Sequence, residues 1–288
     1  MTEVRKNAEI PPPESKKHDL LGLILRVGLF VLIGWLSLQI FFVVLLWLTG
    51  STFITSAMGV FAAASLANAI TVRIYERGQL SAIGLGWGHR SSREFLLGCG
   101  SGIAAACVVL LTPVAGGVAS FERVPSSEHI VPSLAFVTIV LLFGAFGEEM
   151  LFHGYAFQLL IRRLGAFATI LPAAVVFGLA HLGNPHSTLL GIGNTMLWGV
   201  LFGYAYLRTG ALWLPIGLHF GWNLALPLLG SNLSGFTMGV LGYTLHWNAG
   251  DLWSGGGYGP EGSLLTTGIV PVLFLAVHRF TAERDQEA

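Results

Sequence analysis

The sequence predicts an all-α, polytopic integral membrane protein with about eight transmembrane helices. The chain is 53% hydrophobic and only 10% charged, whereas a soluble domain carries about 25% charged residues. Its apolar residues fall in runs of about 20, which is the number of helical residues that crosses a hydrocarbon core of about 30 Å. We therefore expect no soluble domain. The formal net charge of +0 gives no attraction to nucleic acid, so no nucleic-acid partner is expected.

The predicted spans follow one another along the chain. Residues 1–22 are expected to form a disordered cytoplasmic tail, residues 23–282 the transmembrane helical domain, and residues 283–288 a second cytoplasmic tail. The spans cover about residues 27–48, 53–72, 94–118, 133–160, 167–182, 188–207, 211–229 and 263–277. The segment 230–262 is rich in Gly, Ser and aromatic residues and has no Lys or Arg. We interpret it as a non-cytoplasmic loop or lid, partly seated at the membrane interface.

The positions of the basic residues orient these spans. An even number of spans places both termini on one side of the membrane. Cytoplasmic segments carry an excess of Lys and Arg, and every Lys and Arg except Arg123 falls before the first span or after an even-numbered span. Both termini are therefore expected in the cytoplasm of a multi-pass protein, and the expected location is a bacterial inner (plasma) membrane.

Two adjacent glutamates, Glu148 and Glu149, lie inside the fourth predicted span. A charged side chain at the bilayer centre costs roughly 2.5–3.5 kcal/mol on insertion scales, and such residues usually face a bundle interior and carry function. Neighbouring residues on a helix point about 100° apart, so the two carboxylates cannot both face one centre. His153 lies four residues after Glu149, on the same helix face, and is placed to hold the second carboxylate.

Polar residues on two other spans lie at a similar depth. At 1.5 Å per helical residue from the cytoplasmic anchors, Glu149, His181, His219 and Asn223 are about 16–24 Å deep. His219 and Asn223 are four residues apart and share one face of the seventh span. A single intramembrane His or Asn often serves only to form a hydrogen bond between helices, worth about 0.6 kcal/mol. A matched set on three helices instead favours a functional cavity between spans 4, 5 and 7.

These residues resemble the CPBP (CAAX protease and bacteriocin-processing, or Abi) family of intramembrane glutamic endopeptidases, which includes the type II CAAX prenyl proteases. That family shows three motifs on separate membrane helices, and the resemblance centres on about residues 133–229. EExxxR matches Glu148 to His153, with His in place of the usual Arg; FxxxH matches Phe177 to His181; and HxxxN matches His219 to Asn223.

The resemblance implies a peptidase that uses no cofactor and a role for each residue. Glu148 would be the general base that activates a water, and His181 would orient that water. His219 and Asn223 would stabilise the oxyanion of the tetrahedral intermediate, with Glu149 and His153 as supporting residues. Because Arg is always charged whereas His titrates near neutral pH, this support is expected to be weaker or to depend on pH. The implied substrate is a membrane-associated or lipid-modified peptide or protein.

Two alternatives stay open. The first is a zinc-dependent membrane metallopeptidase, because Glu148, His181 and His219 are acceptable zinc ligands and two His with one carboxylate form a known catalytic set. No H-E-x-x-H motif is present, so the metal-free reaction is favoured only through the resemblance. The second is a non-catalytic membrane scaffold or a proton-coupled transporter. Transporters often show internal repeats, and none is visible in the sequence.

Overall fold

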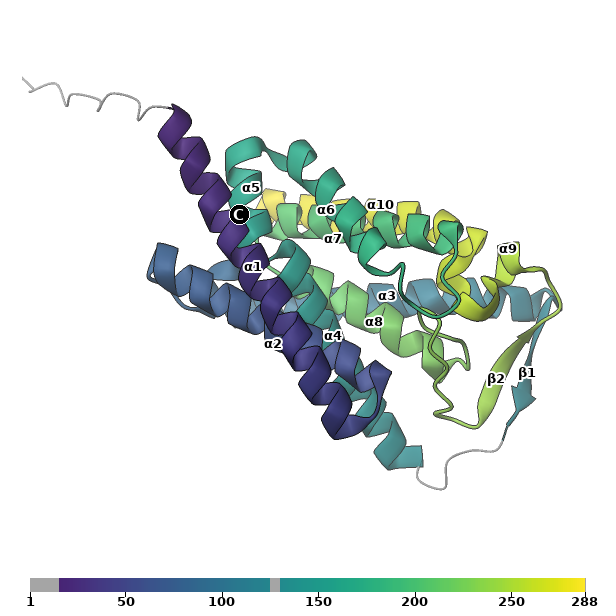
Figure 1. Ribbon diagram of the computed structural model, residues 1–288. Coiled ribbons are helices and arrows are strands. Elements are labelled where there is room, and N and C mark those ends of the chain that lie inside the picture. Colours follow the sequence, from purple (N-terminus) through teal and green to yellow (C-terminus); the bar gives the residue numbers. More distant parts are fainter. Residues whose placement is uncertain (1–15, 125–129, 288) are drawn as a thin grey trace, which may run out of the picture.

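The computed structural model describes residues 16–124 and 130–287. Its helices run back and forth between two ends of one bundle (Figure 1). The helices are α1 Lys16–Thr49, α2 Thr52–Thr71, α3 His89–Ala115, α4 Ile130–His153, α5 Tyr155–Leu164, α6 Ala166–Ala180, α7 Leu189–Thr209, α8 Trp213–Leu228, α9 Asp251–Ser254 and α10 Leu264–Glu287. Short π and 3-10 turns are η1 Val72–Glu76, η2 Leu80–Ile83, η3 Gly256–Tyr258 and η4 Pro260–Gly262. The predicted all-α, polytopic membrane class is confirmed.

Among the residues that the structure describes, five stretches are long and apolar enough to cross a membrane: Leu20–Thr49, Thr52–Glu76, His89–Ala115, Ile130–Leu164 and Leu264–Ala282. Helix α6 is apolar but shorter, so the count of eight spans stays a prediction. Large apolar side chains on α1 point away from the bundle, with Val31 57% and Trp47 83% exposed. Such a surface is suited to lipid, where apolar side chains need no protein cover. The protein is an integral membrane protein.

Several boundaries differ from the expected ones. Helix α1 already begins at Lys16, so residues 16–22 are helical rather than part of the tail, whose residues 1–15 lie outside the described residues. Helix α10 continues to Glu287, well past the predicted end of the last span and through most of the second tail. The described ends of α1 and α10 lie at the same end of the bundle (Figure 1).

A small antiparallel sheet at the other end of the bundle was not expected. Strand β1, Ala119–Arg123, pairs with β2, Tyr243–Trp247, in the register Ala119↔Trp247 to Arg123↔Tyr243. β2 belongs to the segment 230–262, so the sheet ties that segment to the end of α3 (Figure 1). The segment 230–262, which was expected to be a loop or lid, is therefore tied to the bundle by strand pairing.

The fourth predicted span is broken where α4 ends and α5 begins, at Gly154. A break frees backbone groups, which cost free energy in an apolar interior unless they are hydrogen-bonded. The buried Asn68 side chain on α2 supplies both partners: Nδ2 donates to the Met150 carbonyl at 2.9 Å, and Oδ1 accepts from the Tyr155 amide at 2.8 Å. This contact fixes the end of α4, the turn that carries Glu148, Glu149 and His153.

Helix α8 is held against α3 by backbone contact. Both helices carry a G-x-x-x-G pattern, Gly98 and Gly102 on α3 and Gly217 and Gly221 on α8. A Cβ added at Gly221 would lie 2.2 Å from the Cys99 carbonyl oxygen, and one at Gly102 would lie 2.3 Å from the Leu218 carbonyl oxygen. Small residues let membrane helices approach in this way. The pairing sets the position of α8, which carries His219 and Asn223.

Gly221→Ala is therefore expected to destabilise the protein by about 1–3 kcal/mol, as overpacking of a tight core does, and to lower activity by displacing α8. Gly100→Ala is the matched control on α3, because a Cβ there meets nothing within 4 Å. Thermal unfolding of the purified protein in lipid measures both. Equal melting temperatures for the two variants would show that the close approach of α3 and α8 does not limit stability.

Candidate active site

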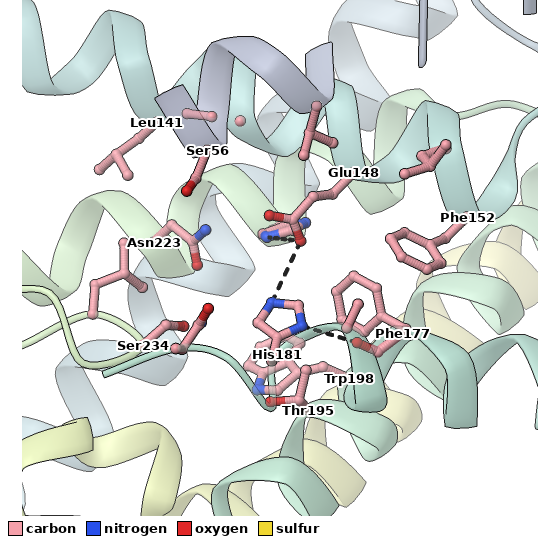
Figure 2. Close-up of a pocket in the computed structure, with 18 of the residues that line it drawn as sticks. Ser56, Leu141, Glu148, Phe152, Phe177, His181, Thr195, Trp198, Asn223 and Ser234 are labelled. Carbon is pink, nitrogen blue, oxygen red and sulfur yellow. Dashed lines mark hydrogen bonds and ion pairs between the residues drawn. The ribbon is translucent and has the colours of Figure 1, made fainter. Parts of the chain in front are cut away.

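A cavity of about 530 Å³ lies inside the bundle. The predicted spans 4, 5 and 7 correspond to α4, α6 and α8, and all three contribute to its wall. Helices α1, α2 and α7 and the segment between α8 and α10 complete it. Glu148, His181, His219 and Asn223 line the cavity, and Figure 2 shows Glu148, His181 and Asn223 converging on one space. The structure thus brings together the four residues expected to be catalytic.

The two glutamates occupy different environments, as their 100° offset requires. Glu148 points into the cavity, with its side chain 25% exposed. Glu149 is fully buried and accepts two hydrogen bonds, from His153 Nδ1 to Oε2 at 2.7 Å and from His219 Nδ1 to Oε1 at 2.9 Å. The contact with His153 was expected from the spacing on α4. The contact with His219 was not, and it joins α4 to α8 directly behind the cavity.

The hydrogen bonds fix which nitrogen of each imidazole faces the cavity. His181 Nδ1 lies 2.9 Å from the Phe177 carbonyl, which can only accept, so this nitrogen carries a hydrogen. His219 Nδ1 likewise donates to Glu149. Both rings therefore present Nε2 to Glu148, whose Oε2 lies 3.7 Å from His181 Nε2 and 3.9 Å from His219 Nε2.

The Oε2 atom of Glu148 is buried and has no hydrogen-bond partner among the described residues. Its separation from each Nε2 is too long for a direct hydrogen bond. Buried polar atoms are normally satisfied by protein or by an ordered water. Three polar atoms around one space, each with a free bonding position, form a site for a small polar molecule such as water.

His181 differs from its expected setting. The sequence placed it inside a span, whereas α6 ends at Ala180 and His181 is the residue that terminates it, with its backbone amide bonded to the Gly178 carbonyl. Phe177 of the same motif lies one turn earlier, packs its ring 5.0 Å from the His181 ring, and supplies the carbonyl that holds Nδ1. The FxxxH spacing therefore positions the imidazole through both the side chain and the backbone of Phe177.

A third carboxylate, Glu261 in η4, also lines the cavity and was missed by the sequence analysis. Its Oε2 accepts hydrogen bonds from the amide and hydroxyl of Ser234, and its Oε1 lies 3.4 Å from Trp222 Nε1. Glu261 falls in the segment 230–262, outside the predicted spans whose helical rise gives a residue its depth. The sequence feature that could have indicated Glu261 is a carboxylate just before a predicted span, in a segment that contains no Lys or Arg to pair with it.

The zinc alternative can be compared with these distances. Zinc binds His nitrogen at about 2.0–2.1 Å and carboxylate oxygen at about 2.0–2.2 Å, so tetrahedral ligand atoms lie roughly 3.4 Å apart. The Glu148 oxygen is farther than this from both Nε2 atoms. Within residues 16–124 and 130–287, no group of three or more His, Cys, Asp or Glu side chains is placed to hold a metal ion. The effect of a strong chelator on peptide cleavage tests whether the protein depends on zinc.

Fold and site together define a polytopic helical membrane protein with a buried carboxylate–imidazole centre. Residues 130–225 match the family of type II CAAX prenyl endopeptidases described as Rce1-like. The matched residues run from α4 into α8 and include Glu148, Glu149, His153, His181, His219 and Asn223. This match confirms the resemblance drawn from the three motifs. No curated protein and no solved structure matches the chain.

Proposed function

We propose that this protein is an intramembrane endopeptidase that hydrolyses peptide bonds with a water activated by Glu148. The observation that carries the proposal is the buried, unpartnered Oε2 of Glu148 facing the Nε2 atoms of His181 and His219. A carboxylate in this position can take a proton from a bound water. The match to a family of prenyl endopeptidases supports a peptidase rather than a scaffold or a transporter.

His181 is suited to hold the water. With its Nδ1 hydrogen used by the Phe177 carbonyl, neutral His181 offers the lone pair of Nε2 to the cavity. A water between His181 and Glu148 would donate one hydrogen to each and direct an oxygen lone pair at the substrate carbonyl. Holding a reactant in this way removes much of the entropic cost of the attack.

His219 is suited to stabilise negative charge on the substrate. Its Nδ1 donates to the fully buried Glu149, and a buried carboxylate next to an imidazole favours the imidazolium, as in a Ser-His-Asp triad. The imidazolium would present Nε2–H to the cavity as a donor. Asn223, one turn farther along α8, lines the same wall and can donate through its amide. The two would bind the oxyanion of the tetrahedral intermediate.

The apolar lining of the cavity supports a membrane-associated substrate. Apolar side chains of the two N-terminal helices line one side, including Leu38 and Phe42 of α1 and Phe53 of α2. Predominantly apolar walls with a few placed polar groups are typical of ligand sites. An apolar or lipid-modified peptide segment would lie along these side chains with its scissile carbonyl beside Glu148.

Cleavage of a panel of membrane-tethered and prenylated peptides by the purified protein in lipid vesicles tests the proposal. We expect cleavage at one defined bond, with the rate unchanged by a strong chelator. Loss of cleavage with chelator and recovery with added zinc would move the reaction to a metallopeptidase that uses Glu148, His181 and His219. Proton-coupled flux in the same vesicles, without cleavage of any peptide in the panel, would contradict a peptidase.

A further inference from the structure

Glu261 is a buried carboxyl group that the mechanism above does not use. It is 9% exposed, and its donors, Ser234 and Trp222, are both neutral. A buried carboxylate is costly unless a cation pairs with it. Burial raises the pKa of the Glu261 carboxyl, and the hydrogen bonds from Ser234 and Trp222 together with the electrostatic effect of His181 offset this only in part. A carboxyl in such surroundings favours its neutral form, which can donate a proton.

The two oxygens of Glu261 are not equivalent. Oε2 accepts from both the amide and the hydroxyl of Ser234, so its accepting positions are filled. Oε1 receives only the long contact from the Trp222 indole at 3.4 Å. Oε1 is therefore the oxygen with room for the proton, and it belongs to a side chain that lines the same cavity as Glu148.

The backbone of Glu261 is held firmly in place. The Nδ2 atom of Asn194, on α7 and 1% exposed, donates to the Glu261 and Ser263 carbonyls at 2.8 Å each. The Oδ1 atom of Asn194 in turn accepts from the Thr267 hydroxyl at 2.7 Å. A side chain supported by such a saturated network is preorganised, as a group acting on substrate must be.

We propose that Glu261 is the general acid that protonates the leaving amine, so that the cavity uses two carboxyl groups in opposite protonation states. Peptide cleavage requires such a proton, because an amide anion is a very poor leaving group. Enzymes separate acid and base roles by giving two carboxyl groups different environments. Here the base, Glu148, is partly exposed and faces two imidazoles, while the acid, Glu261, is buried among neutral donors.

The step balances in protons and bonds. Water gives one proton to Glu148 as its oxygen bonds to the scissile carbon. When the C–N bond of the tetrahedral intermediate breaks, its electron pair goes to nitrogen, which takes the proton from Glu261. The products are a carboxylic acid and a neutral amine, leaving protonated Glu148 and ionised Glu261. Return of one proton from Glu148 to Glu261, carried by water that enters the cavity, resets both groups.

A matched pair of substrates tests this role. One is a membrane-tethered peptide that the wild-type protein cleaves, and the other has an ester in place of the scissile amide, because an alkoxide leaves with far less need of a proton. Glu261→Gln is expected to lower kcat for the amide about 10²–10⁴-fold, the usual contribution of general acid catalysis, and kcat for the ester only a few-fold. Glu122→Gln, which neutralises a half-exposed carboxylate on β1, is the charge-matched control and should leave both rates unchanged.

The outcomes separate this role from a structural one. If Glu261→Gln slows the amide and the ester by the same factor, Glu261 only supports the cavity wall and the inference fails. Because the inference rests on the proposed peptidase activity, Glu148→Gln is measured beside it. Loss of both cleavages in Glu148→Gln, with an unchanged amide-to-ester ratio in Glu261→Gln, would overturn the acid role alone. Failure of the wild-type protein to cleave any peptide of the panel, in its amide or its ester form, would overturn both proposals.

A second measurement needs no variant and so does not depend on how Glu261→Gln folds. The other ionisable groups that surround this part of the cavity are Glu148, His181, His219 and Tyr258, and they act on both substrates alike. Ionisation of Glu261 should slow only the amide. As pH rises, the wild-type rate on the amide is therefore expected to fall before the rate on the ester. Superimposable pH profiles would contradict the inference.

Discussion

Replacing Glu148 by glutamine is expected to abolish peptide cleavage and to leave the protein folded. Glutamine keeps the size of the side chain but cannot accept a proton from water, so the base is lost while the cavity keeps its shape. General base catalysis contributes about 10²–10⁴-fold in rate, and kcat is expected to fall by at least this factor. Steady-state cleavage of a tethered peptide in lipid vesicles measures the loss, with KM little changed.

Folding should survive because Glu148 makes no hydrogen bond that the rest of the protein depends on. Its buried Oε2 has no partner among the described residues. Replacing Glu148 by glutamine therefore takes the acceptor away from no other group of the protein. The melting temperature of Glu148→Gln should therefore match that of the wild-type protein. Cleavage at the wild-type rate by a folded Glu148→Gln would rule out Glu148 as the base and direct attention to His181.

Much of this site could be predicted from the sequence because the position of a residue along a membrane-spanning helix gives its depth in the bilayer. Helical rise fixes how far each polar residue lies from a basic anchor, and that was enough to group Glu148, His181, His219 and Asn223. The i, i+4 rule predicted the contact between Glu149 and His153. These inferences use only local geometry along one helix and the thickness of the membrane.

What escaped prediction depends on how helices meet. The hydrogen bond from His219 to Glu149 joins residues 70 positions apart and follows from the close packing of α8, which no local pattern gives. The break at Gly154 is stabilised by Asn68 of another helix. Glu261 reaches the cavity through the fold of a segment outside the spans. Depth counting applies to residues on spanning helices, so it had no means of placing this one.

Glu149 is expected to contribute both to stability and to catalysis, and two substitutions separate these contributions. Leucine has a similar size but cannot accept a hydrogen bond, so Glu149→Leu leaves the Nδ1 hydrogens of His153 and His219 buried without partners. Breaking a buried pair by removing one member costs about 3–5 kcal/mol. We expect Glu149→Leu to melt at a much lower temperature and to lose activity, because His219 is no longer held.

Glutamine at position 149 should separate stability from chemistry. Its amide oxygen can accept from His219, and its amide nitrogen can donate to the other tautomer of His153, so the free energy of unfolding should stay within about 1.5 kcal/mol of wild type, the net worth of a typical hydrogen bond. The neutral amide no longer favours the His219 imidazolium, which removes the proposed charged donor to the oxyanion. Losing one such donor costs roughly 2.7–4 kcal/mol, or about 10²–10³-fold in kcat.

The expected pattern for Glu149→Gln is therefore near-wild-type melting with a kcat about 10²–10³-fold lower and little change in KM, since Glu149 does not line the cavity. Thermal unfolding and steady-state cleavage on the same preparation provide both quantities. A wild-type kcat in Glu149→Gln would mean that His219 acts as a neutral imidazole and that Glu149 serves only to join α4 to α8. A kcat that falls only together with melting temperature, as in Glu149→Leu, would likewise reduce Glu149 to a structural residue. Both substitutions remove the carboxylate, but only Glu149→Gln leaves the two histidines with hydrogen-bond partners. The negative charge of Glu149 therefore contributes to the reaction if Glu149→Gln loses kcat while it keeps the wild-type melting temperature.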